Sequence, residues 1–155
     1  MKTHTLVLVT LAAAVLLATR GGDAAAGATK GPMKTSRVAS NEAAATKEVW
    51  GELRAYFQGE TYGLRDVLTG TVTLKPGQEP HPPHTHAEEE FLYIVEGSGQ
   101  WHLNGKDFAA AKGDTIYTEP WVVHGIKNTG ATPLTFVVVK WNTKGMAVPK
   151  APATD

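Results

Sequence analysis

Between residues 67 and 141 the sequence breaks into short runs of β-branched and aromatic residues, separated by glycine, proline and other turn formers. Six runs have the length of a strand: "VLTGTVTL", "EFLYIV", "GQWHL", "DTIYT", "WVVHGI" and "PLTFVVVKW". Such close spacing is typical of an all-β sandwich or barrel, and no long stretch carries the 3.6-residue apolar stripe of an amphipathic helix. The pattern therefore predicts a small all-β barrel.

Turn residues mark the boundaries between these runs. Asn104-Gly105, between "QWHL" and "KDF", is a strong signal for a tight hairpin. Lys75-Pro76-Gly77 and Lys112-Gly113-Asp114 predict further turns. At 155 residues the chain has the length of one domain, and we assign the barrel to residues 49–143.

The first 26 residues have the features of a secretory signal peptide. Lys2 is followed by an apolar run of about 13 residues at positions 6–18, which is too short to span a bilayer as a helix. Small residues at positions 24–28 then fit a small-x-small cleavage site. We therefore predict a secreted or periplasmic protein; the alternative is an uncleaved N-terminal anchor.

The segments that flank the predicted barrel have little to bury. Residues 27–48 are rich in Ala, Thr, Ser, Lys and Gly, which predicts a flexible arm. Residues 144–155 contain Pro149 and Pro152 and are expected to form a loose tail.

Charge and cysteine content limit the classes of function. Without the three charged residues in positions 1–26 (Lys2, Arg20 and Asp23), the 15 basic and 15 acidic residues fall to 13 and 14, with no basic stripe. Nucleic acid and, after signal cleavage, the membrane are therefore poor partners. The chain has no cysteine, which excludes disulfides, thiolate ligands and a cysteine nucleophile.

The run "HPPHTHAEEEF" at positions 81–91 carries the most chemistry. If it continues as a strand, His84 and His86 point to the same face, and Glu90 keeps that parity. Two imidazoles and a carboxylate suit a divalent first-row metal, and His124 in "WVVHGI" is the candidate for a fourth ligand. The alternative is a solvated loop, which Pro82 and Pro83 favour.

The chain resembles the cupins, a superfamily of small jelly-roll barrels, through two motifs. The first, Gly, His-x-His, Glu and Gly, matches "GQEPHPPHTHAEEEFLYIVEG"; the second, Gly, Pro-x-Gly-x-x-His and Asn, matches "GDTIYTEPWVVHGIKN". Two departures stand out. Gly77 and His84 are one residue further apart than usual, and Glu119 and Trp121 replace the Pro and the second Gly of the second motif.

The resemblance implies a single cupin jelly-roll β-barrel whose metal ligands are His84, His86, Glu90 and His124. It implies one divalent transition metal, and Fe, Mn, Ni, Cu and Zn all suit nitrogen and oxygen ligands. Glu89 is a weaker alternative to Glu90, because a bulge would change the strand parity. We expect Glu88 to face solvent.

Four further residues are candidates for a ligand pocket: His81, Tyr93, Trp101 and Trp121. His81 would be an acid/base group at the pocket mouth, or an exposed loop residue. Trp121 would be an aromatic wall, or would serve core or dimer packing. The period-2 pattern alone does not assign Tyr93 and Trp101 to one face.

The resemblance leaves two classes of function open. One is a metal-dependent dioxygenase, isomerase or lyase that acts on a small organic acid, phenol or sugar. The other is a non-catalytic module that binds a metal or a small ligand such as a sugar. A third reading, a metal-free remnant that only assembles into dimers, requires the ligand set to be coincidental. Cupins commonly form homodimers, which we expect here by analogy.

Overall fold

The computed structural model describes residues 31–153, and this part of the chain consists of strands joined by turns and loops. The strands are β1 (Ala44–Glu48), β2 (Gly51–Gly59), β3 (Leu64–Leu74), β4 (Glu89–Glu96), β5 (Ser98–Leu103), β6 (Lys106–Ala111), β7 (Thr115–Thr118), β8 (His124–Lys127) and β9 (Leu134–Thr143). No helix in residues 31–153 is long and apolar enough to cross a membrane.

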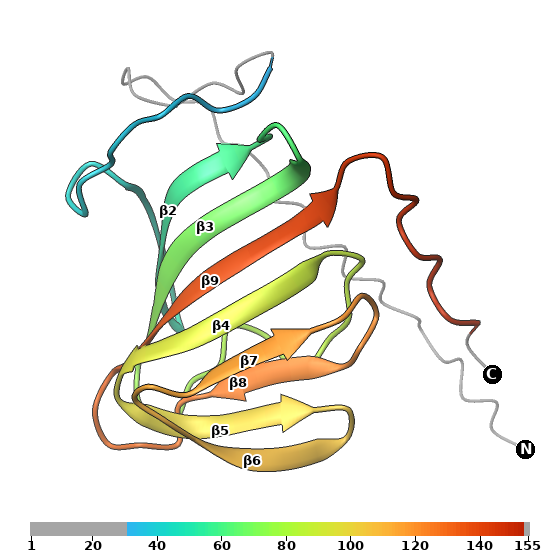
Figure 1. The fold of residues 1–155 in the computed structure, drawn as a ribbon. Coiled ribbons are helices and arrows are strands. Elements are labelled where there is room, and N and C mark those ends of the chain that lie inside the picture. Colours follow the sequence, from blue (N-terminus) through green and yellow to red (C-terminus); the bar gives the residue numbers. More distant parts are fainter. Residues whose placement is uncertain (1–30, 154–155) are drawn as a thin grey trace, which may run out of the picture.

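The strands form two antiparallel sheets that face each other (Figure 1). One has six strands in the order β1-β2-β3-β9-β4-β7, and the other has three in the order β6-β5-β8. The predicted all-β fold is confirmed. The sheets enclose a common core, and within residues 31–153 no strand ladder joins them into a closed cylinder.

Strict alternation decides which side chains enter the core. In β4, positions 90, 92 and 94 are buried while 91, 93 and 95 are exposed, and in β9 positions 134, 136 and 138 are buried. The core cluster draws on both sheets: Val72, Leu74, Leu92, Ile94, Trp101, Ala110, Ile116, Ile126, Leu134, Phe136 and Val138. On the inner face of the six-stranded sheet, the core side chains of β4 and β9 thus lie toward one end of these strands, and positions 90 and 140 lie toward the other.

Five of the six predicted runs fall in strands, and one differs. "WVVHGI" was expected to be a strand with His124 in its middle, but β8 begins at His124, and residues 121–123 lie in a loop. Trp121 explains the break, because its φ of 67° lies in the left-handed region, which a strand does not contain. Asn104 and Gly105 both have positive φ, as the predicted hairpin turn between β5 and β6 requires.

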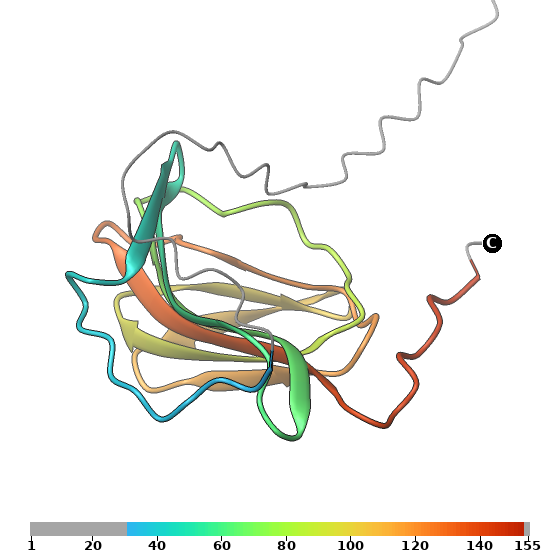
Figure 2. The same cartoon turned by 90° about the horizontal axis from the view of Figure 1, so that it is seen from above.

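The segments outside the predicted barrel have mixed outcomes. The predicted signal peptide and the start of the arm lie outside the described residues, so export stays a prediction. Residues 44–48, expected in the arm, form the edge strand β1, whose five residues are all exposed. Residues 144–153 contain no strand and run away from the sheets (Figure 2). The structure describes one chain, so the homodimer stays a prediction.

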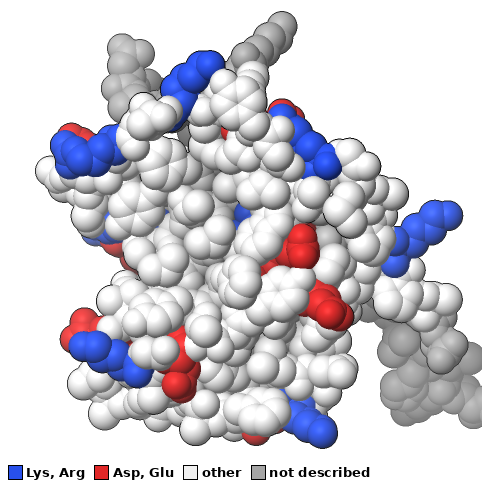
Figure 3. Space-filling model, viewed as in Figure 1, with Lys and Arg blue, Asp and Glu red and all other residues white. Residues whose placement is uncertain are grey.

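On the face shown in Figure 3, Lys and Arg side chains lie mostly near the edges and form no continuous basic stripe, whereas acidic side chains also lie nearer the middle. Apolar side chains are exposed on the outer side of β4 and β7, where Phe91, Tyr93 and Tyr117 are each close to half exposed. Phe91 contacts both the Tyr117 ring and the Trp141 ring, at centroid distances of 5.0 and 5.6 Å.

Asn128, the last residue of the second motif, is fully buried and ties three segments together. Its amide nitrogen donates to the carbonyl oxygens of Leu74 and Thr132, and its Oδ1 accepts from the Gly130 N–H. Its main-chain carbonyl also accepts from the N–H of Gly77. Asn128 therefore fixes the loops that follow β3 and β8 to each other.

We expect Asn128→Ala to destabilise the protein by about 3 kcal/mol, because it leaves the buried Leu74 carbonyl and the partly buried Thr132 carbonyl and Gly130 N–H without this partner. Urea unfolding measures this loss. Asn142→Ala is the matched control: it removes one exposed hydrogen bond to Asp66 and should cost less than about 0.5 kcal/mol. Equal stabilities of the two variants would contradict the structural role of Asn128.

Candidate metal centre

The loop that carries His84 and His86 is fixed to β8 by main-chain hydrogen bonds. His84 and His124 form an isolated antiparallel bridge, in which each N–H donates to the other's carbonyl at 3.0 Å. The predicted strand from His84 to Glu90 is wrong, because β4 begins only at Glu89. Pro82 and Pro83 have no N–H to donate, which ends the ladder after a single bridge.

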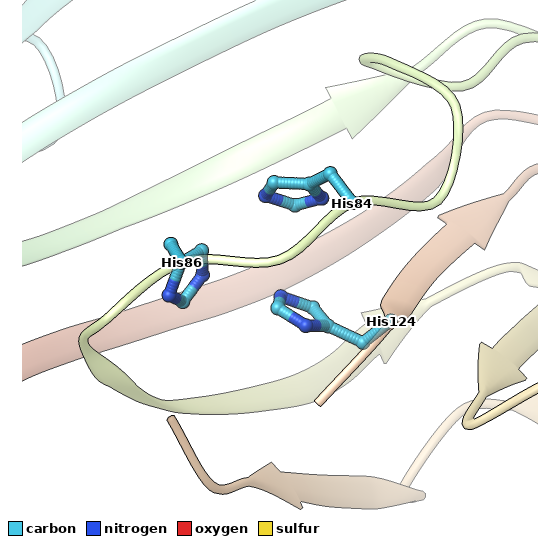
Figure 4. A group of neighbouring side chains, drawn as sticks. All are labelled: His84, His86 and His124. Carbon is cyan, nitrogen blue, oxygen red and sulfur yellow. The ribbon is translucent and has the colours of Figure 1, made fainter. Parts of the chain in front are cut away.

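The three histidine side chains point toward one another from the loop and from the start of β8 (Figure 4). One ring nitrogen from each of His84, His86 and His124 lies within 4.8 Å of the others. The buried Glu90 carboxylate completes the group: its oxygens lie 3.5 Å from His86 Nε2 and 3.4 Å from His124 Nε2. The structure thus brings all four predicted ligands together.

Two main-chain carbonyls orient the rings of His86 and His124. His86 Nδ1 donates to the Glu88 carbonyl at 3.0 Å, and His124 Nδ1 donates to the Val122 carbonyl at 2.8 Å. A carbonyl only accepts, so the proton of each neutral ring is on Nδ1, and the lone pair of Nε2 faces Glu90. Such support from a second layer of groups is typical of metal-binding histidines.

Unpaired nitrogen atoms at the centre of this group fit a metal ion. Four buried side-chain N or O atoms among residues 31–153 have no hydrogen-bond partner, and three of them are His84 Nδ1, His86 Nε2 and His124 Nε2. Buried polar atoms normally have partners, so three unpaired nitrogens beside one carboxylate need an explanation. A divalent cation bound among them would satisfy all three.

The pKa values of Glu90 and His84 favour the deprotonated forms that bind a metal, whereas that of His124 favours a proton. Burial alone would raise the pKa of the Glu90 carboxyl, but His124 and His86 outweigh it and lower that pKa to about 2. Burial, with the neighbouring imidazoles, lowers the pKa of His84 to about 4. Burial also opposes a charge on His124, yet the Glu90 carboxylate and the Val122 carbonyl together raise its pKa. Glu90 is therefore a carboxylate and His84 is neutral at pH 7.

A cavity of about 240 Å³ opens beside the four side chains, between the six-stranded sheet and β8. His81 lines it and packs edge-on against His84, at a centroid distance of 3.9 Å. Most of the wall is apolar: Trp50, Leu53, Leu68, Val72, Pro80, Leu92, Ile126, Phe136 and Val138. The size and lining suit a ligand smaller than a typical drug molecule.

Of the four candidate pocket residues, the structure brings only His81 to this cavity. Tyr93 is on the outer face of β4 and is 47% exposed. Trp101 is buried in the core, paired in register with Phe108 and Ile126.

Trp121 lies outside the cavity but contacts the site through its backbone. Its N–H donates to the His86 carbonyl at 2.8 Å, and its indole N–H donates to the Pro149 carbonyl at 2.6 Å. It occupies the motif position of glycine, and its left-handed φ costs a non-glycine residue about 1–3 kcal/mol. The two hydrogen bonds hold this strained residue between the histidine loop and the C-terminal segment.

Sequence reasoning missed one pair of residues beside the histidines. Glu88 does not face solvent as expected: its carboxylate lies 3.3 Å from the Lys140 ammonium and 3.5 Å from His86 Nδ1. Glu89 points elsewhere and accepts a 2.6 Å hydrogen bond from the Tyr117 hydroxyl, which raises the pKa of Tyr117 to about 12. The period-2 pattern of β9 contained the signal for Lys140, which follows Phe136 and Val138 on the inner face.

The comparisons with known proteins agree with the fold. Residues 70–140 match the family model of the cupin domain. An oxalate-binding protein of Thermotoga maritima is 38% identical over 72 residues, which make up 46% of this chain and 60% of that protein. The chain thus spans less than two thirds of the length of this relative.

Two solved structures share the arrangement of strands. A predicted oxalate decarboxylase of Thermotoga maritima has a TM-score of 0.56 and 28% identity, over 68% of this chain and 98% of that one. An RmlC-like cupin from Shewanella frigidimarina has a TM-score of 0.57 and 16% identity, over 72% and 95% of the two chains, which shows the fold alone. The domain match and the two motifs identify residues 70–140 as a cupin domain, and the two structures share its fold.

Proposed function

We propose that this cupin binds one divalent transition metal through His84, His86, Glu90 and His124, and that a small chelating organic acid of the size of oxalate binds to the metal inside the cavity. The observation that carries the proposal is the set of three buried, unpaired imidazole nitrogens around one buried carboxylate. Nitrogen and oxygen donors suit Fe, Mn, Ni, Cu and Zn. When bound, the metal would supply a Lewis acid for the oxygens of the ligand.

The protein's own residues support binding of a small acid in three ways. The carbonyls of Glu88 and Val122 hold two of the rings in one tautomer, so the site is organised before the metal arrives. The apolar wall offers few hydrogen-bond partners, which suits a flat acid better than a polyhydroxylated sugar. The oxalate-binding relative, which is 38% identical over the matched region, supports the same ligand class.

We favour binding over catalysis because the described cavity offers few groups to move a proton. Apart from the four proposed ligands, its ionisable side chains are His81 and Lys140. Lys140 is paired with Glu88, and His81 Nδ1 faces the Pro82 carbonyl. His81 is thus the single group in this lining that is placed to transfer a proton at the cavity mouth.

Calorimetry with the zinc-loaded and the metal-free protein tests this proposal. We expect oxalate to bind the zinc-loaded protein with one ligand per chain, and to bind the metal-free protein at least about 100-fold more weakly. Equal binding with and without zinc would contradict it. Formate and carbon dioxide are measured in the same samples, loaded in turn with Mn, Fe, Ni, Cu and Zn. Their release in any of them would replace the binding function with a lyase.

A further inference from the structure

Lys140 is the one lysine or arginine among the described residues that line the cavity. It follows the buried positions Leu134, Phe136 and Val138 on the inner face of β9, where a core residue would otherwise stand. In the antiparallel register of β4 and β9 it lies directly opposite Glu90. Cross-strand neighbours of this kind have Cβ atoms about 4.5–5.5 Å apart, so Lys140 projects into the cavity beside a proposed metal ligand.

The Lys140 ammonium is only partly covered, and its counter-charge is Glu88. The side chain is 29% exposed, and Nζ lies 3.3 Å from Glu88 Oε1. Because both side chains are partly exposed, water screens this ion pair, so it contributes little and Lys140 can leave it.

The rest of the wall leaves a negatively charged ligand few other partners. A metal neutralises only the ligand oxygens that it binds, and the apolar side chains around them offer no charge. In such a poorly hydrated space a charge-assisted hydrogen bond is stronger than in water. A free carboxylate oxygen would therefore find its best partner in Lys140.

We propose that Lys140 is the specificity residue of the cavity: its ammonium leaves Glu88 and binds the ligand oxygens that the metal does not neutralise, so that the site selects anions over neutral chelators. This inference rests on the proposed function and assigns a role to a residue outside the metal-binding set.

Substitution of Lys140 by methionine tests the proposal in the zinc-loaded protein. We expect K140M to bind oxalate about 10- to 100-fold more weakly than the unchanged protein, as the loss of one charge-assisted hydrogen bond predicts. K140R should keep most of the affinity, because it keeps the charge. K106M is the matched control, since Lys106 is exposed on the β5–β6 hairpin outside the cavity.

A second variant separates a charge effect from a structural one. Glu88→Gln removes the counter-charge of Lys140 and the carboxylate 3.5 Å from His86 Nδ1, but keeps the main-chain carbonyl that orients His86. At equal zinc content, oxalate should therefore bind as tightly or a few-fold more tightly. An E88Q variant as weak as K140M would overturn the proposal, because the pair would then act as a structural unit. K140M binding within twofold of the unchanged protein would also overturn it.

Zinc content and oxalate binding of the unchanged protein show which of the two proposals fails. If the unchanged protein binds zinc and oxalate and K140M binds both equally well, only the role of Lys140 is refuted. If the unchanged protein binds zinc but no oxalate, the ligand class itself is wrong, and the role of Lys140 is refuted with it.

Discussion

Replacement of His124 by alanine should lower the affinity for a divalent metal by more than about 100-fold. His124 is 2% exposed, its Nε2 has no hydrogen-bond partner, and its ring lies 4.7 Å from those of both His84 and His86. The other three side chains would then have to bind the ion without the ring that lies between them. Metal content after dialysis against zinc, measured by elemental analysis, gives the result.

Two further variants show whether a loss of metal comes from the missing ligand or from unfolding. His86→Ala changes a loop residue instead of a core residue, so its loss of metal is not explained by unfolding, and circular dichroism should show an intact fold. His102→Ala is the matched control, because His102 pairs with Asp107 at 2.7 Å and lies outside the cavity. Metal content in H86A or H124A equal to that of H102A would refute the ligand assignment.

Metal affinity should fall as the pH falls below the raised pKa of His124, and the loss should approach about tenfold per pH unit for one competing proton. His124 has a raised pKa in the metal-free site, so a proton occupies the ring that the metal needs, and acid favours the proton. Glu90 and His84 stay ready for metal, because the pKa of Glu90 is lowered to about 2 and that of His84 to about 4.

Calorimetric titrations with zinc from pH 5 to pH 8, in buffers of different protonation enthalpy, measure both the affinity and the protons released. We expect about one proton to be released per zinc bound at pH 6. The thermal stabilisation by zinc should shrink in parallel, since a ligand stabilises the folded state only in proportion to its binding. An affinity independent of pH, with no proton release, would contradict the charge state described for the site.

Much of the arrangement of the site could be predicted from strand parity and the two cupin motifs. Parity in β4 placed Glu90 on the inner face, and the second motif supplied His124. The pairing of His84 with His86 was correct for the wrong reason. The prediction used the alternation of a continuous strand, whereas a single bridge to His124 and the hydrogen bond from Trp121 to His86 position the loop.

Some features could not be predicted from the sequence, and others could have been predicted but were missed. The alternation that turns Glu90 inward also turns Tyr93 outward, and it places Lys140 inward after Phe136. To predict where the Trp101 side chain points, one must know which sheet contains β5, and the local pattern does not supply this. The contacts of the Glu88 and Val122 carbonyls with the histidine rings could not be predicted for a different reason. The direction of a carbonyl in a loop depends on backbone angles that residue identity does not set.

The proposed metal centre consists of one ion held by His84, His86, Glu90 and His124. The most direct test is anomalous diffraction at the zinc edge from crystals of the protein grown with zinc chloride. We expect one strong peak per chain between these side chains, at about 2.0–2.2 Å from the histidine nitrogens and a Glu90 oxygen. A map with no peak there, or with its strongest peak at His102 and Asp107 instead, would contradict it.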